Sequence, residues 1–149
     1  MKVRPYTKDD KQQVLALFSL NTPKYFDSAE ETDLIHYLEN ELEDYFVAEE
    51  GESIVGAGGL NYFPKENTAR ISWDFVHPDF HGQGIGQALV RHRLHHLKRL
   101  NWVKKVVVRT SQFAYRFYEK MGFELKETKK DYWAPGFDLY LMSQPNHPD

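Results

Sequence analysis

Hydrophobic residues in the first third of the chain recur at helical spacing. Thr7 and Asp10 have the spacing of a capping box at a helix start, directly after a short predicted strand at residues 3–6. Ser28 and Glu31 repeat that spacing farther along. Each pair precedes a hydrophobic stripe, formed first by Val14, Leu15, Leu17 and Phe18 and then by Leu34, Ile35, Leu38 and Leu42. We therefore expect two helices, of which the second has an acidic opposite face made of Glu30, Glu31, Asp33, Glu39, Glu41, Glu43 and Asp44.

The pattern changes to strand-like segments from residue 45 onward. Strands separated by tight turns are predicted at residues 45–49, 53–62 and 68–77, followed by a glycine-rich loop and a helix over 86–100. A valine-rich strand at 104–109, a helix capped by Ser111 and ended by Gly122, and two closing strands at 123–130 and 137–142 complete the chain. The order β-α-α-β-β-β-α-β-α-β-β predicts an α/β fold with a mixed sheet, neither doubly wound nor a sandwich.

Composition narrows the classes of function. A length of 149 residues, 41% hydrophobic and 15% aromatic, predicts one compact domain over residues 1–149. The formal net charge of -3 argues against a nucleic-acid partner, because phosphate binding needs a concentrated basic face. The absence of cysteine excludes disulfides, thiolate metal sites and cysteine nucleophiles. No signal-peptide pattern and no apolar run of about 18 residues is visible, so we expect a cytoplasmic protein without a membrane partner.

The most informative segment is a loop with glycines at every second position. A predicted strand runs into Gly82, Gly84 and Gly86 and then directly into a helix. Successive amides in such a turn form an anion-binding nest, and the helix N-terminus adds partial positive charge, so the expected ligand is a pyrophosphate. No lysine follows as in a P-loop, and Gln87 replaces the third glycine of a Rossmann fingerprint. A glycine-rich turn without a ligand remains the alternative from the loop alone.

A second segment, residues 107–123, favours the pyrophosphate-binding loop over a glycine-rich turn without a ligand. It contains Ser111-Gln112-Phe113-Ala114 and then Phe117-Tyr118-Glu119-Lys120-Met121-Gly122-Phe123. Together with Val76, Pro78, Phe80 and the glycine loop, it resembles the GNAT superfamily of N-acetyltransferases. The sequence departs from the family pattern at His81, where arginine or glutamine is usual, and at Ser111, where asparagine is usual.

The resemblance implies a GNAT-like fold in which the sheet splays to admit acetyl-CoA (coenzyme A). Pantetheine would lie along the strand before the loop, as a peptide adds to a sheet edge. The residues implied in cofactor binding are Phe75, Val76, His81, Gly82, Gln83, Gly84, Ile85, Gly86, Gln87, Ser111 and Tyr118.

The resemblance also implies an acyltransferase mechanism by direct attack of an amine on the thioester. The Val76 amide would stabilise the oxyanion, and Tyr118 would act as the general acid for the departing thiolate. A structural tyrosine packed against the sheet is the alternative for Tyr118. Asp74 is the candidate general base because it is a carboxylate flanked by Trp73 and Phe75, and a water relay is the alternative.

The acceptor is predicted less directly. We expect an acetyl-CoA-dependent N-acetyltransferase acting on a small-molecule amine, with the acidic helix face attracting a cation. A protein or peptide N-acetyltransferase and a non-catalytic acyl-CoA-binding sensor are the alternatives, and a homodimer through the C-terminal strands is consistent with the family. His92 and His96 have helical i, i+4 spacing, but Arg93 replaces the glutamate of a zinc protease, so we expect a solvated helix face and no metal site.

Overall fold

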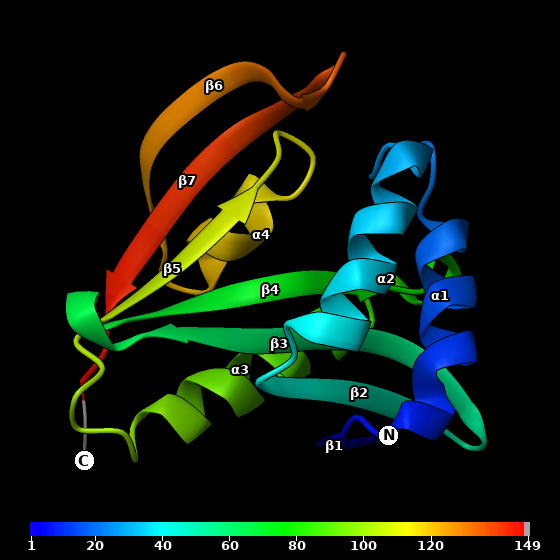
Figure 1. The fold of residues 1–149 in the computed structure, drawn as a ribbon, viewed down its shortest axis with the longest axis horizontal. Helices are drawn as coiled ribbons and strands as arrows, with labels where there is room; N and C mark the ends of the chain where they lie inside the picture. Colours follow the sequence, from blue (N-terminus) through cyan, green and yellow to red (C-terminus); the bar gives the residue numbers. More distant parts are fainter. Residues whose placement is uncertain (148–149) are drawn as a thin grey trace.

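The computed structural model describes residues 1–147, and the predicted order of elements is confirmed (Figure 1). The helices are α1 (Lys11–Leu20), α2 (Glu31–Asn40), α3 (Ile85–Leu97) and α4 (Tyr115–Lys120). The strands are β1 (Lys2–Pro5), β2 (Asp44–Glu50), β3 (Ser53–Phe63), β4 (Thr68–Val76), β5 (Lys105–Thr110), β6 (Glu124–Ala134) and β7 (Phe137–Pro145).

The seven strands in the described part of the chain form one sheet in the order β1-β2-β3-β4-β5-β7-β6. Neighbours are antiparallel except β4 and β5, which are parallel. The β4–β5 ladder extends only from the Thr68–Lys105 pair to the Ile71–Val108 pair. Beyond it the two strands diverge, as Figure 1 shows, so the sheet opens in its middle.

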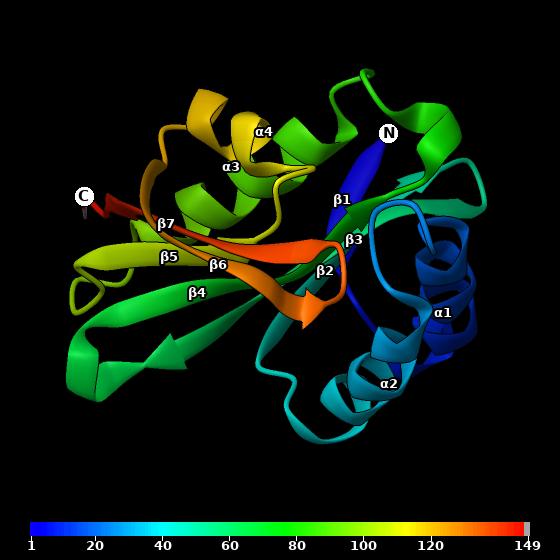
Figure 2. The ribbon, with the colours of Figure 1, turned by 90° about the horizontal axis from the view of Figure 1, so that it is seen from above.

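Helices cover both faces of the sheet (Figure 2). On one face α1 and α2 bury residues such as Phe18 and Leu34 against β2 and β3. On the other face α3 and α4 bury Val90, Leu97 and Tyr118 against β4, β5 and β7. The opening between β4 and β5 is therefore flanked by helices from both layers.

An irregularity in β4 places two neighbouring side chains on opposite sides of this opening. The register shifts so that Ala57 pairs with Phe75 and Gly59 with Ser72, which leaves Trp73 and Asp74 opposite Gly58. Trp73 has a φ of 48°, and the extra residue forms a β-bulge. The Trp73 ring packs against Phe18 of α1, with ring centroids 5.9 Å apart, whereas Asp74 is directed toward α3 and α4.

Two predicted helix starts need correction, and one is confirmed. Thr7 and Asp10 do form a capping box, in which the Thr7 amide donates to Asp10 Oδ2 over 2.8 Å. The second box lies one residue earlier than predicted, at Asp27 and Glu30, because Asp27 accepts from the Ala29 amide. Helix α4 begins at Tyr115 rather than beside Ser111, since residues 111–114 form a turn before the helix.

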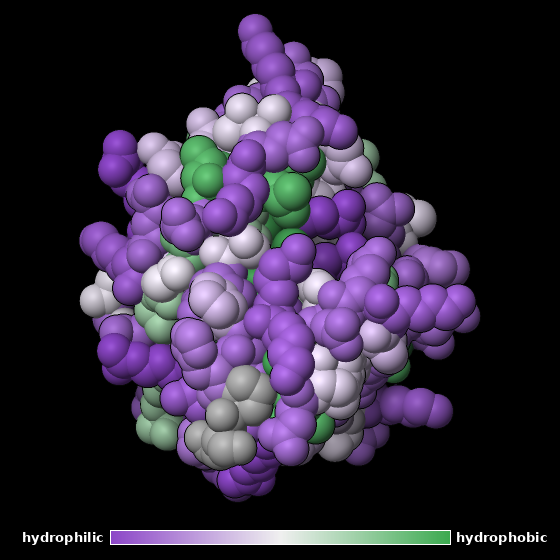
Figure 3. All heavy atoms as spheres, turned by 90° about the vertical axis from the view of Figure 1, so that its left-hand side faces the viewer, coloured by the Kyte–Doolittle hydropathy of each residue, from purple (hydrophilic) through white to green (hydrophobic). Residues whose placement is uncertain are grey.

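The side of the molecule at the left of Figure 1 is mostly hydrophilic, with hydrophobic side chains visible only in small separate areas (Figure 3). Strand β6 lies at one edge of the sheet and is exposed along most of its length. Among residues 1–147, no helix has the length and apolar character needed to cross a membrane. The homodimer through the C-terminal strands stays a prediction.

Candidate functional site

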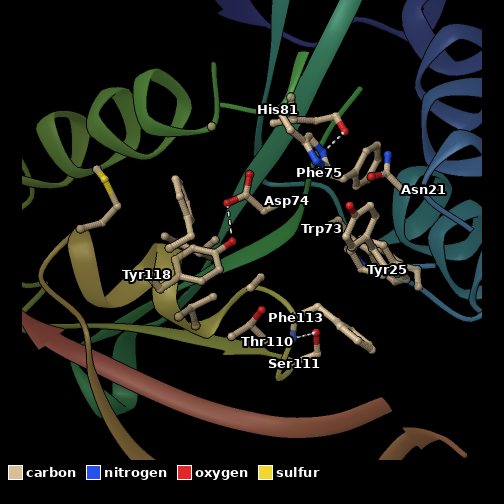
Figure 4. Close-up of a pocket in the computed structure, with 18 of the residues that line it drawn as sticks. Asn21, Tyr25, Trp73, Asp74, Phe75, His81, Thr110, Ser111, Phe113 and Tyr118 are labelled. Atoms are coloured by element: carbon tan, nitrogen blue, oxygen red, sulfur yellow. Dashed lines mark hydrogen bonds between the residues drawn. The ribbon is translucent and has the colours of Figure 1, made fainter. Parts of the chain in front are cut away.

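A cavity of about 690 Å³ occupies the opening of the sheet (Figure 4). Its walls come from the bulged part of β4, the glycine loop and first turn of α3, the end of β5, and α4. The segment between α1 and α2 closes the opposite side and contributes Asn21 and Tyr25 to the lining. The cavity therefore joins segments that are far apart in the sequence.

Nearly all residues predicted to bind the cofactor meet at this cavity. Those that line it are Phe75, Val76, His81, Gly82, Gly84, Ile85, Gly86, Gln87, Ser111 and Tyr118. Gln83 does not line it, because its side-chain amide turns back to donate to the Asp79 carbonyl over 3.3 Å. The predicted general base, Asp74, lines the cavity as well.

The backbone of the glycine loop has the shape of an anion cradle. Gly82 and Gly84 have φ values of 78° and 84°, which glycine adopts readily and other residues adopt at a cost. The amides in the first turn of α3 have no acceptor within the helix, and the helix dipole adds positive potential there. Since Ile85 and Gly86 line the cavity, a negatively charged group could bind at this end.

Val76 presents backbone groups to the cavity. The His77 amide donates to the Val55 carbonyl over 2.8 Å. Because hydrogen-bonded and non-hydrogen-bonded pairs alternate in an antiparallel ladder, the Val76 amide and carbonyl point away from β3. His81 Nε2 lies 3.1 Å from the Val76 carbonyl oxygen, which fits this orientation. The open side of β4 can thus pair with an extended ligand.

The Tyr118 side chain extends from α4 into the opening and meets Asp74 (Figure 4). Its hydroxyl donates to Asp74 Oδ2 over 2.6 Å. Arg93 of α3 approaches from the other side, and its Nη2 lies 2.8 Å from Asp74 Oδ1. The Arg93 side chain is fully buried and that of Asp74 is 9% exposed, so these groups form a buried charged network at the cavity wall.

This environment changes the acidity of Tyr118. Burial, followed by the nearby Asp74 charge, raises the pKa of the Tyr118 hydroxyl well above its usual value of about 10. The hydroxyl is therefore protonated at neutral pH, and its hydrogen is directed at a carboxylate.

The opposite end of the cavity is aromatic and carries little negative charge. Trp73, Tyr25, Phe26, Trp133 and Phe137 all line it. Of the seven acidic residues predicted to attract a cation, only Glu30 lines the cavity. The prediction of a broadly acidic acceptor wall is therefore wrong, because the other six carboxylates, on α2 and in the segment from its end to the first residue of β2, do not line the cavity.

Glu30 is partly buried where it lines the cavity. Burial raises the pKa of its carboxyl to about 7, although Glu30 Oε2 accepts from the Asp27 amide over 3.2 Å. The cavity thus contains a carboxyl group that changes charge near neutral pH.

The sequence interpretation gave Arg93 no role beyond its replacement of the glutamate of a zinc protease, and so missed it. The structure buries Arg93 completely, while His92 and His95 on the same helix are exposed. A signal was present in the chain: Leu89, Arg93 and Leu97 are spaced four residues apart and so lie on one side of the helix. An arginine between two buried leucines indicates an internal ion pair.

The sequence matches the Acetyltransferase (GNAT) family over residues 11–123. A relative from Methanocaldococcus jannaschii, an uncharacterized N-acetyltransferase, is 28% identical over 141 residues, which cover 86% of this chain and 62% of that protein. The chain therefore spans less than two thirds of that relative's length.

Solved structures share the fold over the whole chain. The ribosomal-protein-S18-alanine N-acetyltransferase from Escherichia coli has a TM-score of 0.81 at 16% identity, with 99% of this chain and 95% of that chain covered. An aminoglycoside 6'-N-acetyltransferase complexed with coenzyme A has a TM-score of 0.78 at 14% identity, with 100% and 99% covered. The family match includes the glycine loop and Tyr118 and covers most of the chain, so the chain belongs to the Acetyltransferase (GNAT) family.

Proposed function

We propose that this protein is an acetyl-CoA-dependent N-acetyltransferase that transfers an acetyl group to a primary amine of a small molecule. The observation that carries the proposal is the cavity between the diverging ends of β4 and β5, with an anion cradle at one end and Tyr118 beside it. The aminoglycoside 6'-N-acetyltransferase with the same fold was solved with coenzyme A, which supports this choice of cofactor.

Each part of the cavity has a role in the proposed reaction. The loop amides hold the pyrophosphate, and the open side of β4 at Val76 pairs with pantetheine. The amine nitrogen attacks the thioester carbonyl carbon, the Val76 amide stabilises the oxyanion, and the carbon–sulfur bond breaks. The proton that the nitrogen loses goes to Asp74 or to a water. Tyr118 donates a proton to the sulfur, and Ser111 and His81 contribute side-chain contacts to the cofactor.

The aromatic end of the cavity supports a small acceptor. Tyr25 and Phe26 line one side, and Trp133 and Phe137 of the β6–β7 hairpin line another. Such walls suit an amine attached to an apolar group. Among the described residues only two carboxyl groups, those of Glu30 and Asp74, line the cavity, which argues against a polyamine. The structural neighbours act on a ribosomal protein alanine and on an aminoglycoside by name, so a peptide acceptor is the competing possibility.

The first test is binding, measured as thermal stability with acetyl-CoA, CoA and NADH at equal concentration. A ligand at a hundred times its dissociation constant stabilises the folded state by about 2.7 kcal/mol. We expect the melting temperature to increase with acetyl-CoA and with CoA and not to increase with NADH. No increase with either CoA species would contradict the proposal.

The second test is transfer to a panel of small primary amines and peptide N-termini. Because the chain has no cysteine, a thiol reagent reports released CoA without a background from the protein. Turnover with small amines at higher kcat/KM than with peptides is expected. The reverse order would identify a peptide acceptor, and binding of CoA without turnover of any amine would favour a sensor.

A further inference from the structure

The contact between Tyr118 and Asp74 restricts how Tyr118 can act as an acid. The two oxygens are 2.6 Å apart, and the phenol has only one hydrogen, which it donates to Asp74. If Tyr118 gave that proton to sulfur while Asp74 stayed ionised, two negative oxygens would face each other at hydrogen-bond distance inside the protein. Like charges this close are strongly disfavoured in a buried site.

Asp74 is held in place by groups that leave it little freedom. Arg93 Nε donates to the Leu89 carbonyl over 3.0 Å and Nη1 to the Gly59 carbonyl over 3.2 Å, so the guanidinium is fixed against Asp74 Oδ1. Gly58 leaves the space for this pair, since a Cβ there would lie 2.6 Å from Asp74 Oδ1. Asp74 cannot turn away from Tyr118 without breaking the ion pair.

Asp74 is nevertheless accessible from the cavity. It lines the cavity between Trp73 and Phe75, and its side chain is 9% exposed. A carboxylate has about four lone-pair sites, so Asp74 can accept from an amine while it also accepts from Tyr118.

We propose that Asp74 and Tyr118 act as one proton relay, in which Asp74 takes the proton from the attacking amine and Tyr118 gives its own to the departing sulfur. The proposal rests on the acetyltransferase function proposed above. The neutral amine forms the new carbon–nitrogen bond, the carbon–sulfur bond breaks, and its electron pair stays on sulfur. One amine proton moves to Asp74 Oδ2, that proton passes to the Tyr118 oxygen, and the original phenol proton goes to sulfur.

The relay leaves both groups as they began, and the products are an amide and a free thiol. At no point do the two oxygens carry negative charge together, which removes the conflict set by their separation. The raised pKa of Tyr118, caused by burial and then by the Asp74 charge, agrees with this, because an isolated tyrosinate would be poorly stabilised there. Arg93 does not touch the reacting atoms and is a positioning residue.

The test compares kcat for Tyr118→Phe, Asp74→Asn and the double variant, with folding and acetyl-CoA affinity measured for each. We expect each single change to lower kcat by about 100-fold or more, the usual range for general acid–base groups. The double variant is expected to be no slower than the slower single variant, because groups that act as one unit lose their function together. Tyr115→Phe on the same helix and Asp33→Asn on α2, both outside the cavity, are the matched controls.

Losses that multiply in the double variant would show an independent acid and base and would overturn the relay, as would an unchanged kcat for Asp74→Asn. If Asp74→Asn alone does not fold, Asp74→Asn is combined with Arg93→Met, which removes both buried charges. This combination then replaces Asp74→Asn both as the single variant and in the double variant with Tyr118→Phe. Failure of the wild-type protein to acetylate any amine would overturn the proposed function as well, whereas turnover with multiplying losses would overturn the relay alone.

The role of Arg93 has a separate readout. Arg93→Met is expected to lower kcat by about 100-fold while the KM for acetyl-CoA stays within about twofold, because the cradle is untouched. Arg93→Lys restores a cation, and its kcat is expected to be at least about tenfold higher than that of Arg93→Met. A parallel change in kcat and KM, or no recovery with lysine, would contradict a positioning role.

Discussion

Gly58 of β3 lies so close to Asp74 of β4 that a Cβ on the glycine would be 2.6 Å from Asp74 Oδ1. The same Cβ would lie 2.7 Å from Arg93 Nη1. The β-bulge that directs Asp74 toward α3 thus needs a residue without a side chain on the neighbouring strand. The charged network at the cavity wall depends on this absence of a methyl group.

Gly58→Ala is therefore expected to disturb the Asp74–Arg93 pair. The added methyl group cannot be accommodated while both partners keep their contacts, so the free energy of unfolding should fall by about 1–3 kcal/mol. Urea denaturation measures the loss. Gly56→Ala is the control for crowding, since its Cβ would meet Leu89 Cδ1 at 2.9 Å instead. If only the Gly56 variant lost stability, the tight fit at Asp74 would be refuted.

Gly84→Ala should weaken acetyl-CoA binding. Gly84 has a φ of 84°, and an alanine there either strains the loop, at about 1–2 kcal/mol, or changes its shape and moves the amides out of position. The expected loss of affinity is about tenfold by calorimetric titration. Gly51→Ala is the matched control, because Gly51 has a φ of 62° in the β2–β3 turn, outside the cavity. Equal affinity in both variants would show that the loop conformation does not matter for binding.

Glu30 is expected to make stability fall as the pH rises. Burial raises its pKa to about 7 in the folded state, above the unfolded value, so the folded protein binds more protons between about pH 4 and 7. Stability from this group is full at low pH and is lost as the pH rises through about 7. Glu30→Gln should therefore be more stable than wild type at pH 8, by about 1 kcal/mol after allowance for solvent screening.

Urea unfolding of both proteins at pH 5 and pH 8 measures this difference. Glutamine keeps a carbonyl that can accept from the Asp27 amide, so the helix start is retained. Glu31→Gln, one residue later and outside the cavity, controls for the loss of one acidic residue. The free energy of unfolding of Glu30→Gln minus that of wild type is expected to increase from pH 5 to pH 8. A difference that decreases over this range would contradict the prediction.

Asp10 is expected to act with the opposite sign. Its pKa is lowered below the usual range, chiefly by the hydrogen bond from Arg4, with Nη1 2.8 Å from Asp10 Oδ2. The stability it contributes is present above about pH 4 and is lost as the pH falls through the folded pKa. Asp10→Asn should lower the free energy of unfolding by about 1–2 kcal/mol at pH 7, and the difference should shrink below pH 4.

Asp9→Asn, an exposed neighbour, is the control for this prediction. A loss of stability for Asp10→Asn that stays constant from pH 7 to pH 3 would indicate packing rather than the charged contact. Arg4 also pairs with Glu49, so part of the stabilisation remains in the variant.

Local patterns in the sequence determined the order of the eleven α-helices and strands that residues 1–147 form, and the position of the glycine loop. Stripes, caps and turns depend on residues a few positions apart, so a linear reading captures them. The start of α4 was misplaced for the same reason, because Ser111 has the local character of a cap but takes part in a turn before the helix.

Only the tertiary structure decided how the side chains around the opening combine. The bulge at Trp73 arises from pairing with β3, and it directs Asp74 to Arg93 and Tyr118 on two separate helices. The same packing leaves Glu30 alone among seven acidic residues at the cavity. The sequence determined by itself which groups are available and on which elements they lie. Their pairing, burial and acidity depend on contacts between residues far apart in the chain, which no local pattern encodes.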